Sequence, residues 1–477
     1  MMNVDDHDDG APMPPRPRAA EGSSAVTADR LGLGCSWGDD VMFGVSSLAN
    51  LAAGYNLAIA GQVLFLVNRG EQHVNESQFS LLASAAFAGA ILGQLVMGWV
   101  GSRIGIVKGL VATFVLLCVG SILGATVCWG STLVKLLAIS RLIVGFGAGG
   151  VYPLAAIASA ESSKSAEFDG RRVMLAFSFQ VVGQLLAPAV VLALDLLMPQ
   201  REKLAWRLAL FFGSVPAGFA IGLVARLPVA EKTTNSIVST HAGQTSAYWT
   251  YGNLVRLIGT GGSWFWFDVQ FYGALTFQPF VLELVLGTKS PVQIAGLSVV
   301  AGVIALCGLY LASYVSDSWG RKRIQLIGFA VTGGVFFLLA GMLRAGPGNQ
   351  SALIFVLYCL TFFFFNFGPN ATTYCLPAET FSAETRTFFH GISAACGKLG
   401  ALVGAAMFKV VLDETSVAIV MLLMSAISAI AIVVTVFFVK GPESQGNETF
   451  RPEENFPNVE TESLFSREEP SIELSRY

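Results

Sequence analysis

The stretch LPVAEKTTNSIVSTHAGQTSAYWTYGN, residues 227–253, is a polar interruption in the middle of a hydrophobic chain. On each side of it lie six apolar segments, each of about the length, ~20 residues, that a helix needs to cross a bilayer. The segments before it are expected near residues 42–67, 79–101, 109–129, 132–160, 173–198 and 208–226. The segments after it are expected near residues 254–285, 293–315, 324–345, 351–376, 389–411 and 416–439. Because lipid offers no hydrogen bonds to the backbone, the pattern predicts an all-α membrane protein with twelve transmembrane helices in two six-helix halves.

The composition supports a membrane protein and excludes several other classes. Hydrophobic residues make up 53% of the chain and charged residues only 13%. The net charge of -3 and the lack of a basic patch argue against a nucleic-acid partner. Seven cysteines form no framework, and no CxxC, HExxH or histidine cluster is present, so neither a metal site nor a cofactor is expected. No Ser/His/Asp set appears within the expected spans, so an enzyme is not expected either.

Lysines and arginines predict how the chain is oriented. They gather in the loops after the second, fourth and eighth spans, as Arg103 and Lys108, as Lys164, Arg171 and Arg172, and as Arg321, Lys322 and Arg323. The positive-inside rule then places both tails and the central linker in the cytoplasm. The predicted organisation is a disordered tail (1–40), a first six-helix half (41–226), a linker (227–253), a second half (254–440) and a disordered tail (441–477). The expected host is the plasma membrane, which the chain crosses many times.

One acidic residue stands inside the expected seventh span. The stretch WFWFDVQFY, Trp264 to Tyr272, places Trp264, Asp268 and Tyr272 four residues apart, and therefore along one face of a helix. A carboxylate at mid-membrane costs ~2.5–3.5 kcal/mol on insertion scales, so it marks a functional site by default. The alternative is that Asp268 pairs with a buried cation only to hold the helices together. A polar stripe in a many-helix protein favours a substrate pathway.

A second motif lies between the eighth and ninth spans. SDSWGRKR, Ser316 to Arg323, resembles the major facilitator superfamily signature D-x-x-G-R-K/R at that loop, and two halves of six helices are the layout of that fold. The resemblance implies that Asp317 caps a helix or pairs with Arg321 and steadies a cytoplasmic gate. The fourth span, Arg141 to Glu161, also looks like a superfamily signature, and most of its glycines are expected to serve helix packing.

Within that superfamily, the chain resembles the phosphate:proton symporter family, which includes fungal and plant high-affinity phosphate transporters. The stretches that carry the resemblance are GTGGSWFWFDVQFYG (259–273), NFGPNATTYCLPAETFSAETR (366–386), HGISAACGKLGA (390–401), and GGVYPLAA with FSFQVVG in the fourth and fifth spans. The resemblance implies a phosphate site lined by an Asn of the tenth span, either Asn366 or Asn370, and by Tyr152, Gln180, Trp264, Asp268 and Tyr272.

The chemistry of these residues suits a tetrahedral oxyanion. Phenol and amide groups donate hydrogen bonds to its oxygens, while Asp268 accepts one from a protonated oxygen or holds a coupled proton. Lys398, about ten residues into an apolar span, is expected to supply positive charge. Its alternative, snorkelling to an interface, is disfavoured by that depth.

The chain also departs from the family pattern. In the first span the family usually has a D-A-Y-D-like run, where this chain has Ala53 and Asn56, and Val151 replaces an Asp before Tyr152. Asp268 is then the one carboxylate expected near the site, so uptake is expected to follow a single proton-linked step or to be uncoupled exchange.

The leading hypothesis is therefore secondary active transport of inorganic phosphate by alternating access, with phosphate, protons and the lipid bilayer as partners. The alternatives are a transporter of another solute, such as a glycerophosphodiester, an organic anion or a sugar, and a nutrient sensor that does not transport.

Overall fold

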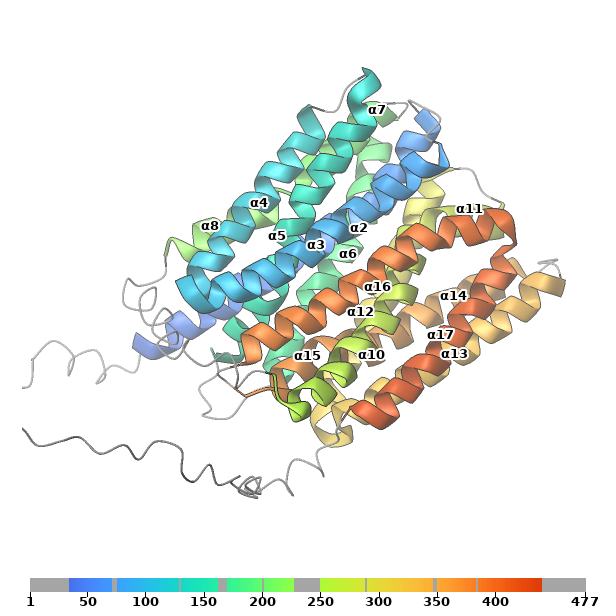
Figure 1. Ribbon diagram of the computed structural model, residues 1–477. Coiled ribbons are helices and arrows are strands. Elements are labelled where there is room, and N and C mark those ends of the chain that lie inside the picture. The colour runs from blue at the N-terminus through green and yellow to red at the C-terminus, as the bar shows by residue number, and fades with distance from the viewer. Residues whose placement is uncertain are drawn as a thin grey trace, which may run out of the picture. The chain divides into compact units, whose positions relative to one another are not determined.

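The computed structural model describes residues 34–70, 75–127, 130–161, 170–199, 201–226, 249–287, 290–345, 350–382 and 385–439, and the regular elements in these ranges are helices (Figure 1). The first half contains α2 (Gly34–Gly70), α3 (Glu76–Ile104), α4 (Ile106–Thr126), η1 (Gly130–Thr132), α5 (Leu133–Glu161), α6 (Gly170–Leu197), α7 (Glu202–Phe212) and α8 (Val215–Val224). The second half contains α10 (Tyr251–Thr276), α11 (Gln278–Leu286), α12 (Pro291–Trp319), α13 (Arg321–Ala345), α14 (Ser351–Phe365), η4 (Asn366–Asn370), α15 (Ala371–Thr380), α16 (Arg386–Glu414) and α17 (Val417–Phe438). A helix or a broken pair of helices covers each of the twelve predicted spans, and the predicted fold class is confirmed.

Two helices begin before the boundaries predicted for them. α2 begins at Gly34, so residues 34–40 are helical and do not belong to the predicted tail. α10 begins at Tyr251, inside the predicted linker, because the side chain of Thr250 caps it by accepting a hydrogen bond from the backbone N–H of Asn253. The rest of the predicted N-terminal tail, linker residues 227–248 and the predicted tail 441–477 lie outside the described residues.

Three of the predicted spans are broken helices. The sixth breaks at Gly213 and Ser214, between α7 and α8, and the seventh at Phe277, between α10 and α11. A proline stands in the first turn of both following helices, where its missing N–H costs nothing. The tenth passes through the π-helix η4, where Gly368 leaves helical geometry next to Pro369.

Eleven segments of the described chain are long and apolar enough to cross a membrane. α10 is not among them, although it has 26 residues and contains the predicted seventh span. Its sequence includes Thr260, Ser263, Asp268 and Gln270, all of them buried. α10, which carries Trp264, Asp268 and Tyr272, is therefore too polar to stand out by apolar length alone.

Glycines bring α3 and α5 into backbone contact. A Cβ at Gly145 would overlap the carbonyl oxygen of Ala86, and one at Gly149 that of Ala90. From the other side, a Cβ at Gly93 would overlap the carbonyl oxygen of Phe146. Small residues of this kind allow close helix packing in lipid, so the packing role predicted for the glycines of residues 141–161 is confirmed for these positions.

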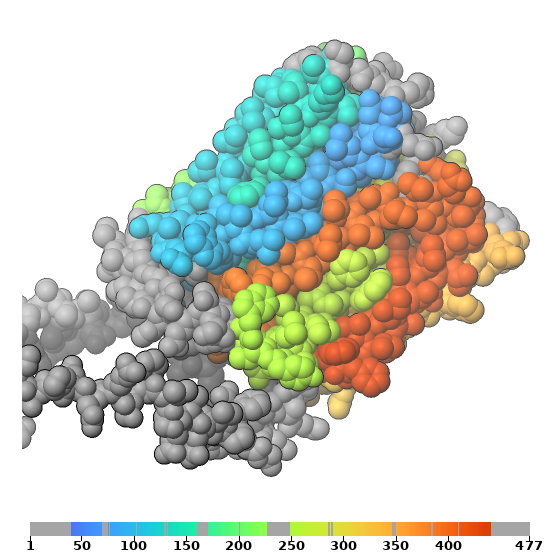
Figure 2. All heavy atoms as spheres, viewed as in Figure 1, coloured from blue at the N-terminus to red at the C-terminus, as the bar shows by residue number. Residues whose placement is uncertain are grey.

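The two halves meet along two pairs of helices. α3 of the first half packs on α16 of the second, and α6 packs on α12. Figure 1 shows α3 and α16 running side by side, and in Figure 2 their side chains form a continuous seam. The residues described next lie on helices that border this meeting of the halves.

Candidate functional site

A buried ion pair lies at the centre of the predicted site. Lys398 on α16 donates a hydrogen bond to Asp268 on α10, with 2.7 Å between Nζ and Oδ2, and each side chain is 1% exposed. α10 and α16 approach closely because a Cβ at Gly400 would overlap the carbonyl oxygen of Phe265, and one at Gly404 that of Val269. The sequence predicted both charged residues but not their pairing. Such an ion pair is also what the alternative hypothesis requires, in which Asp268 only holds the helices together.

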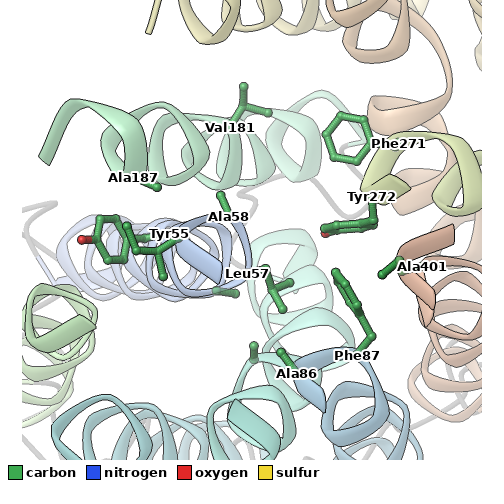
Figure 3. Packing of buried hydrophobic residues seen from close by; sticks show 14 of the residues in the cluster. Tyr55, Leu57, Ala58, Ala86, Phe87, Val181, Ala187, Phe271, Tyr272 and Ala401 are labelled. Carbon is green, nitrogen blue, oxygen red and sulfur yellow. The ribbon is translucent and has the colours of Figure 1, made fainter. Parts of the chain in front are cut away.

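Two phenols join the halves above this pair. The hydroxyl oxygens of Tyr152 on α5 and Tyr272 on α10 lie 3.1 Å apart and share a hydrogen bond. The ammonium of Lys398 lies 4.6 Å from the ring centre of Tyr152 and 4.3 Å from that of Tyr272, within the range of cation–π attraction. Figure 3 shows Tyr272 facing Phe87 of α3, with Ala401 of α16 beside it. The centre is thus built from both halves.

Aromatic rings close the centre on one side. The ring of Trp264 lies 6.1 Å from that of Tyr152 and 6.3 Å from that of Tyr374 on α15, and Tyr374 stacks on Phe177 of α6 at 4.1 Å. Trp264 also packs against the backbone of α16, where a Cβ at Gly397 would lie 2.8 Å from the indole Nε1. The structure brings five predicted residues into one enclosed cluster, in which each is at most 2% exposed: Tyr152, Trp264, Asp268, Tyr272 and Lys398.

The remaining three predicted binding residues lie on elements next to this cluster. Gln180 is buried on α6, and its side-chain oxygen has no hydrogen-bond partner among the described residues. Asn366 and Asn370 share one face of η4, as their spacing predicted, and the Asn370 amide donates to the Asn366 side-chain oxygen at 2.6 Å. Asn366 also donates to the carbonyl oxygen of Phe362, so more of its capacity is used within the helix. Asn370 is therefore the better placed of the two for a ligand.

The predicted gate pair forms, with an additional partner. Arg321 lies 2.9 Å from Asp317 and 3.0 Å from Glu379, which the sequence analysis did not single out. The Cys375 thiol contacts the same Glu379 carboxylate at 3.4 Å and the carbonyl oxygen of Gly170 at 3.6 Å. Gly170 is the first residue of α6, so this cluster also spans the two halves. The segment LPAETFSAETR contained Glu379, but nothing in its spacing pointed to Arg321.

The neutral residues at the family's acidic positions have structural partners. Asn56 donates to the carbonyl oxygens of Ala52 and Gly213, each at 2.9 Å, and accepts from Ser121 at 2.9 Å. It therefore ties α2 to α4 and to the break between α7 and α8. Val151 is completely buried on α5, next to Tyr152. Within the described residues no cluster of side chains suits a metal ion.

Comparison with known proteins places the chain in a family. Residues 46–376 match the model of the Major Facilitator Superfamily. The chain is 30% identical over 410 residues to inorganic phosphate transporter PT2 of Toxoplasma gondii, covering 83% of this chain and 71% of that protein. It is 29% identical over 434 residues to probable inorganic phosphate transporter 1-6 of Arabidopsis thaliana, covering 76% and 82%, respectively. It is 31% identical over 399 residues to inorganic phosphate transporter 1-2 of Oryza sativa subsp. japonica, covering 68% and 73%.

Solved structures agree on the fold. A partially occluded, inward-open structure of the xylose transporter XylE from E. coli superimposes with a TM-score of 0.70 at 20% identity, covering 85% of this chain and 98% of that one. The proton:xylose symporter XylE bound to 6-bromo-6-deoxy-D-glucose gives 0.69 at 20% identity, covering 84% and 96%. With two halves of six spans, a centre shared between them and a family match over residues 46–376, this chain belongs to the Major Facilitator Superfamily.

Proposed function

We propose that this protein moves inorganic phosphate across a membrane by alternating access, carrying one proton with each dihydrogen phosphate. The observation that carries the proposal is the Lys398–Asp268 ion pair, buried between the halves beneath the phenols of Tyr152 and Tyr272. The relatives described above are inorganic phosphate transporters, which supports phosphate as the substrate. The proposed host is the plasma membrane, with the linker and both tails in the cytoplasm and the Asp317–Arg321 pair acting as a gate there.

The donors in the centre match a phosphate ion. The ammonium of Lys398 has three N–H groups, of which one donates to Asp268, and the two tyrosines contribute O–H groups. Phosphate accepts the same kind of charge-assisted bond from the lysine as the Asp268 carboxylate does, about twice as strong as a neutral one, so the two anions can compete for Lys398. Gln180 and Asn370 provide amide donors from α6 and η4.

The empty centre is electrically balanced. A single charge buried in low dielectric costs several kcal/mol, whereas Lys398 and Asp268 neutralise each other when they are paired. The empty carrier can therefore rearrange between its two orientations without moving an unbalanced charge through the apolar core.

The loaded centre is balanced only if it also holds a proton. Dihydrogen phosphate brings one negative charge, so together with Lys398 and an ionised Asp268 the centre would carry a net negative charge. Protonation of Asp268 restores neutrality and frees Lys398 for the phosphate. The ion pair thus favours coupled transport over the uncoupled exchange that the sequence also allowed, because only the protonated loaded state is as neutral as the empty one.

The test is uptake of radiolabelled phosphate into proteoliposomes, with Asp268→Asn as the decisive variant. With phosphate bound, this variant is neutral and can still exchange phosphate for phosphate. When it is empty, Lys398 has lost its counter-charge, so the return step is slow. We expect exchange to persist and net uptake to fall at least tenfold.

The matched control is Asp413→Asn, which removes an exposed carboxylate from the far end of the same α16. It should leave both rates unchanged. Normal net uptake by Asp268→Asn would contradict the coupling, and a wild type that binds and moves no phosphate would contradict the substrate. Glycerophosphodiesters, organic anions and sugars serve as competitors in the same assay.

A further inference from the structure

A histidine lies on the proposed cytoplasmic side of the centre, and the transport scheme above does not use it. His390 on α16 is 0% exposed and stands eight residues before Lys398, which is about 12 Å along a helix. The direction is towards Arg386, at the end of α16 that the positive-inside rule places in the cytoplasm. The other histidines of the chain, His7, His73 and His241, lie outside the described residues.

The contacts of His390 identify its tautomer. Nε2 lies 3.1 Å from the carbonyl oxygen of Tyr374. A carbonyl can only accept, so Nε2 carries the hydrogen and Nδ1 has the lone pair. Nδ1 is buried and has no hydrogen-bond partner among the described residues. The imidazole therefore keeps a proton-accepting nitrogen unused inside the protein, where most buried polar atoms are paired.

The ring of His390 touches the walls of the proposed phosphate site. It lies edge-on to Trp264, with the ring centres 5.8 Å apart, and edge-on to Tyr374, at 5.5 Å. Both of these rings also pack on Tyr152. His390 is therefore separated from the Lys398–Asp268 centre by a single layer of aromatic side chains.

A second polar side chain with unused capacity lies across the seam between the halves. Both Oε1 and Nε2 of Gln94 on α3 are buried and lack hydrogen-bond partners among the described residues. The backbone of Gln94 faces the residue after His390, because a Cβ at Gly391 would lie 2.9 Å from the Gln94 carbonyl oxygen. Buried polar atoms without hydrogen-bond partners among the described residues thus lie on both sides of the seam between α3 and α16, on the proposed cytoplasmic side of the centre.

We infer that His390 is a second proton-binding residue of the transport cycle, which receives the proton released from Asp268 and passes it to the cytoplasm. The inference rests on the proposed function. As the O–H bond of Asp268 breaks, a proton reaches Nδ1 through water that enters the inward-open site, and an N–H bond forms there. The imidazolium then gives this proton to cytoplasmic water, which restores neutral His390 and ionised Asp268.

The proposed proton transfer takes place in the inward-open state, where water reaches the ring of His390. An unperturbed histidine changes charge near pH 6.5, between the ranges of carboxylates and phenols. Tyr374 on α15 is an ionisable side chain in ring contact with His390. The helices packed around it also carry Arg141 and Tyr152 on α5, Arg256, Asp268 and Tyr272 on α10, Cys375 and Glu379 on α15 and Arg103 on α3, with Arg386 and Lys398 on α16 itself. The neutral Gln94 of α3 lies opposite Gly391, the residue after His390. Asn56 and Val151, which stand where the family has acids, cannot bind and release a proton. In the proposed cycle His390 therefore serves as the second proton-binding residue.

The test is phosphate uptake into right-side-out membrane vesicles whose internal pH is set between about 5.5 and 8, at constant external pH. The decisive variant is His390→Gln, whose amide can still donate to the Tyr374 carbonyl but cannot be protonated at neutral pH. Net uptake by the wild type should fall as the internal pH drops through the histidine range. We expect the variant to lose this dependence and to show at least fivefold slower net uptake, while phosphate exchange remains within twofold of wild type.

His390→Asn provides a second substitution that places an amide near the Nδ1 position, in case the glutamine variant does not fold. A wild-type internal-pH profile in either folded variant would overturn the inference. An equal loss of exchange and net uptake would also overturn it, because that pattern indicates a structural role. If the wild type itself moves no phosphate, the proposed function fails, which the wild-type measurement shows independently of both variants.

Discussion

At the scale of single residues, the Lys398–Asp268 pair predicts an unusual pattern of stability. Lys398→Gln leaves the Asp268 carboxylate buried without its cation, and removing one partner of a buried pair costs about 3–5 kcal/mol. Adding Asp268→Asn removes the stranded charge and leaves two neutral amides in its place. The double variant should therefore unfold at a higher temperature than Lys398→Gln alone, as measured by thermal unfolding in detergent. An additive loss of stability would show that the two side chains do not depend on each other.

The sequence identified the types of residue in the centre but not their partners. Asp268 and Tyr272 were predicted from their spacing on one helix face, and that spacing is local. The contacts that define the centre are distant in sequence, with 130 residues between Asp268 and Lys398 and 120 between Tyr152 and Tyr272. Their pairing depends on how the two halves meet, which no local pattern encodes. The same reason explains why Glu379 and His390 were not singled out.

At the scale of helices, the space around two glycines predicts opposite effects of their substitution, one at the contact between α3 and α5 and one on α13. Gly145→Ala forces a methyl group into the carbonyl of Ala86, and overpacking of this kind typically costs about 1–3 kcal/mol. Gly334→Ala on α13 meets nothing within 4 Å, so it should be neutral or stabilise the helix by up to about 1 kcal/mol. Thermal unfolding of the two variants in detergent measures the difference. Equal unfolding temperatures would contradict the close packing.

The ends of α6 and α15 that we propose to face the cytoplasm offer a second prediction at this scale. Glu379→Gln removes the partly buried ion pair with Arg321 on α13, and so loosens the cluster whose Cys375 thiol contacts Gly170 of the first half. The buried Cys375 thiol should then react faster with a maleimide, because the cytoplasmic side opens more often. Asp413→Asn is the matched control, since it removes an exposed carboxylate at the far end of α16. A Cys375→Ser variant gives the background, and unchanged labelling in Glu379→Gln would contradict the gate.

The helices themselves were largely predictable, and their breaks were not. Apolar length located every span, because crossing lipid requires it. α10 begins before its predicted start because Thr250 caps it, and the tenth span bends at Gly368 because Pro369 follows. Capping and kinks depend on single residues, and a count of apolar positions does not detect them. The signal is weakest for α10, because buried polar residues lower its apolar character.

At the scale of the whole molecule, the centre is shared between halves that must separate and rejoin during alternating access. Tyr152 belongs to the first half, whereas Asp268, Tyr272 and Lys398 belong to the second. The charged groups thus move with one half, and the first half contributes a neutral phenol. Relative motion of the halves acts on the Tyr152–Tyr272 contact but not on the ion pair, which lies within the second half, so we expect the empty carrier to stay neutral throughout its return.

This charge balance predicts the driving force for transport. If one proton accompanies each dihydrogen phosphate, the loaded and empty centres are both neutral, and no net charge crosses the membrane in a cycle. A pH gradient that is acidic outside should therefore drive accumulation into proteoliposomes, and an ionophore that collapses it should abolish accumulation. A membrane potential set by potassium and valinomycin at equal pH should drive none. Potential-driven uptake would contradict the one-proton balance, because it requires a further positive charge to move with each phosphate, and the described residues of the centre offer only Asp268 as a carboxylate to carry it.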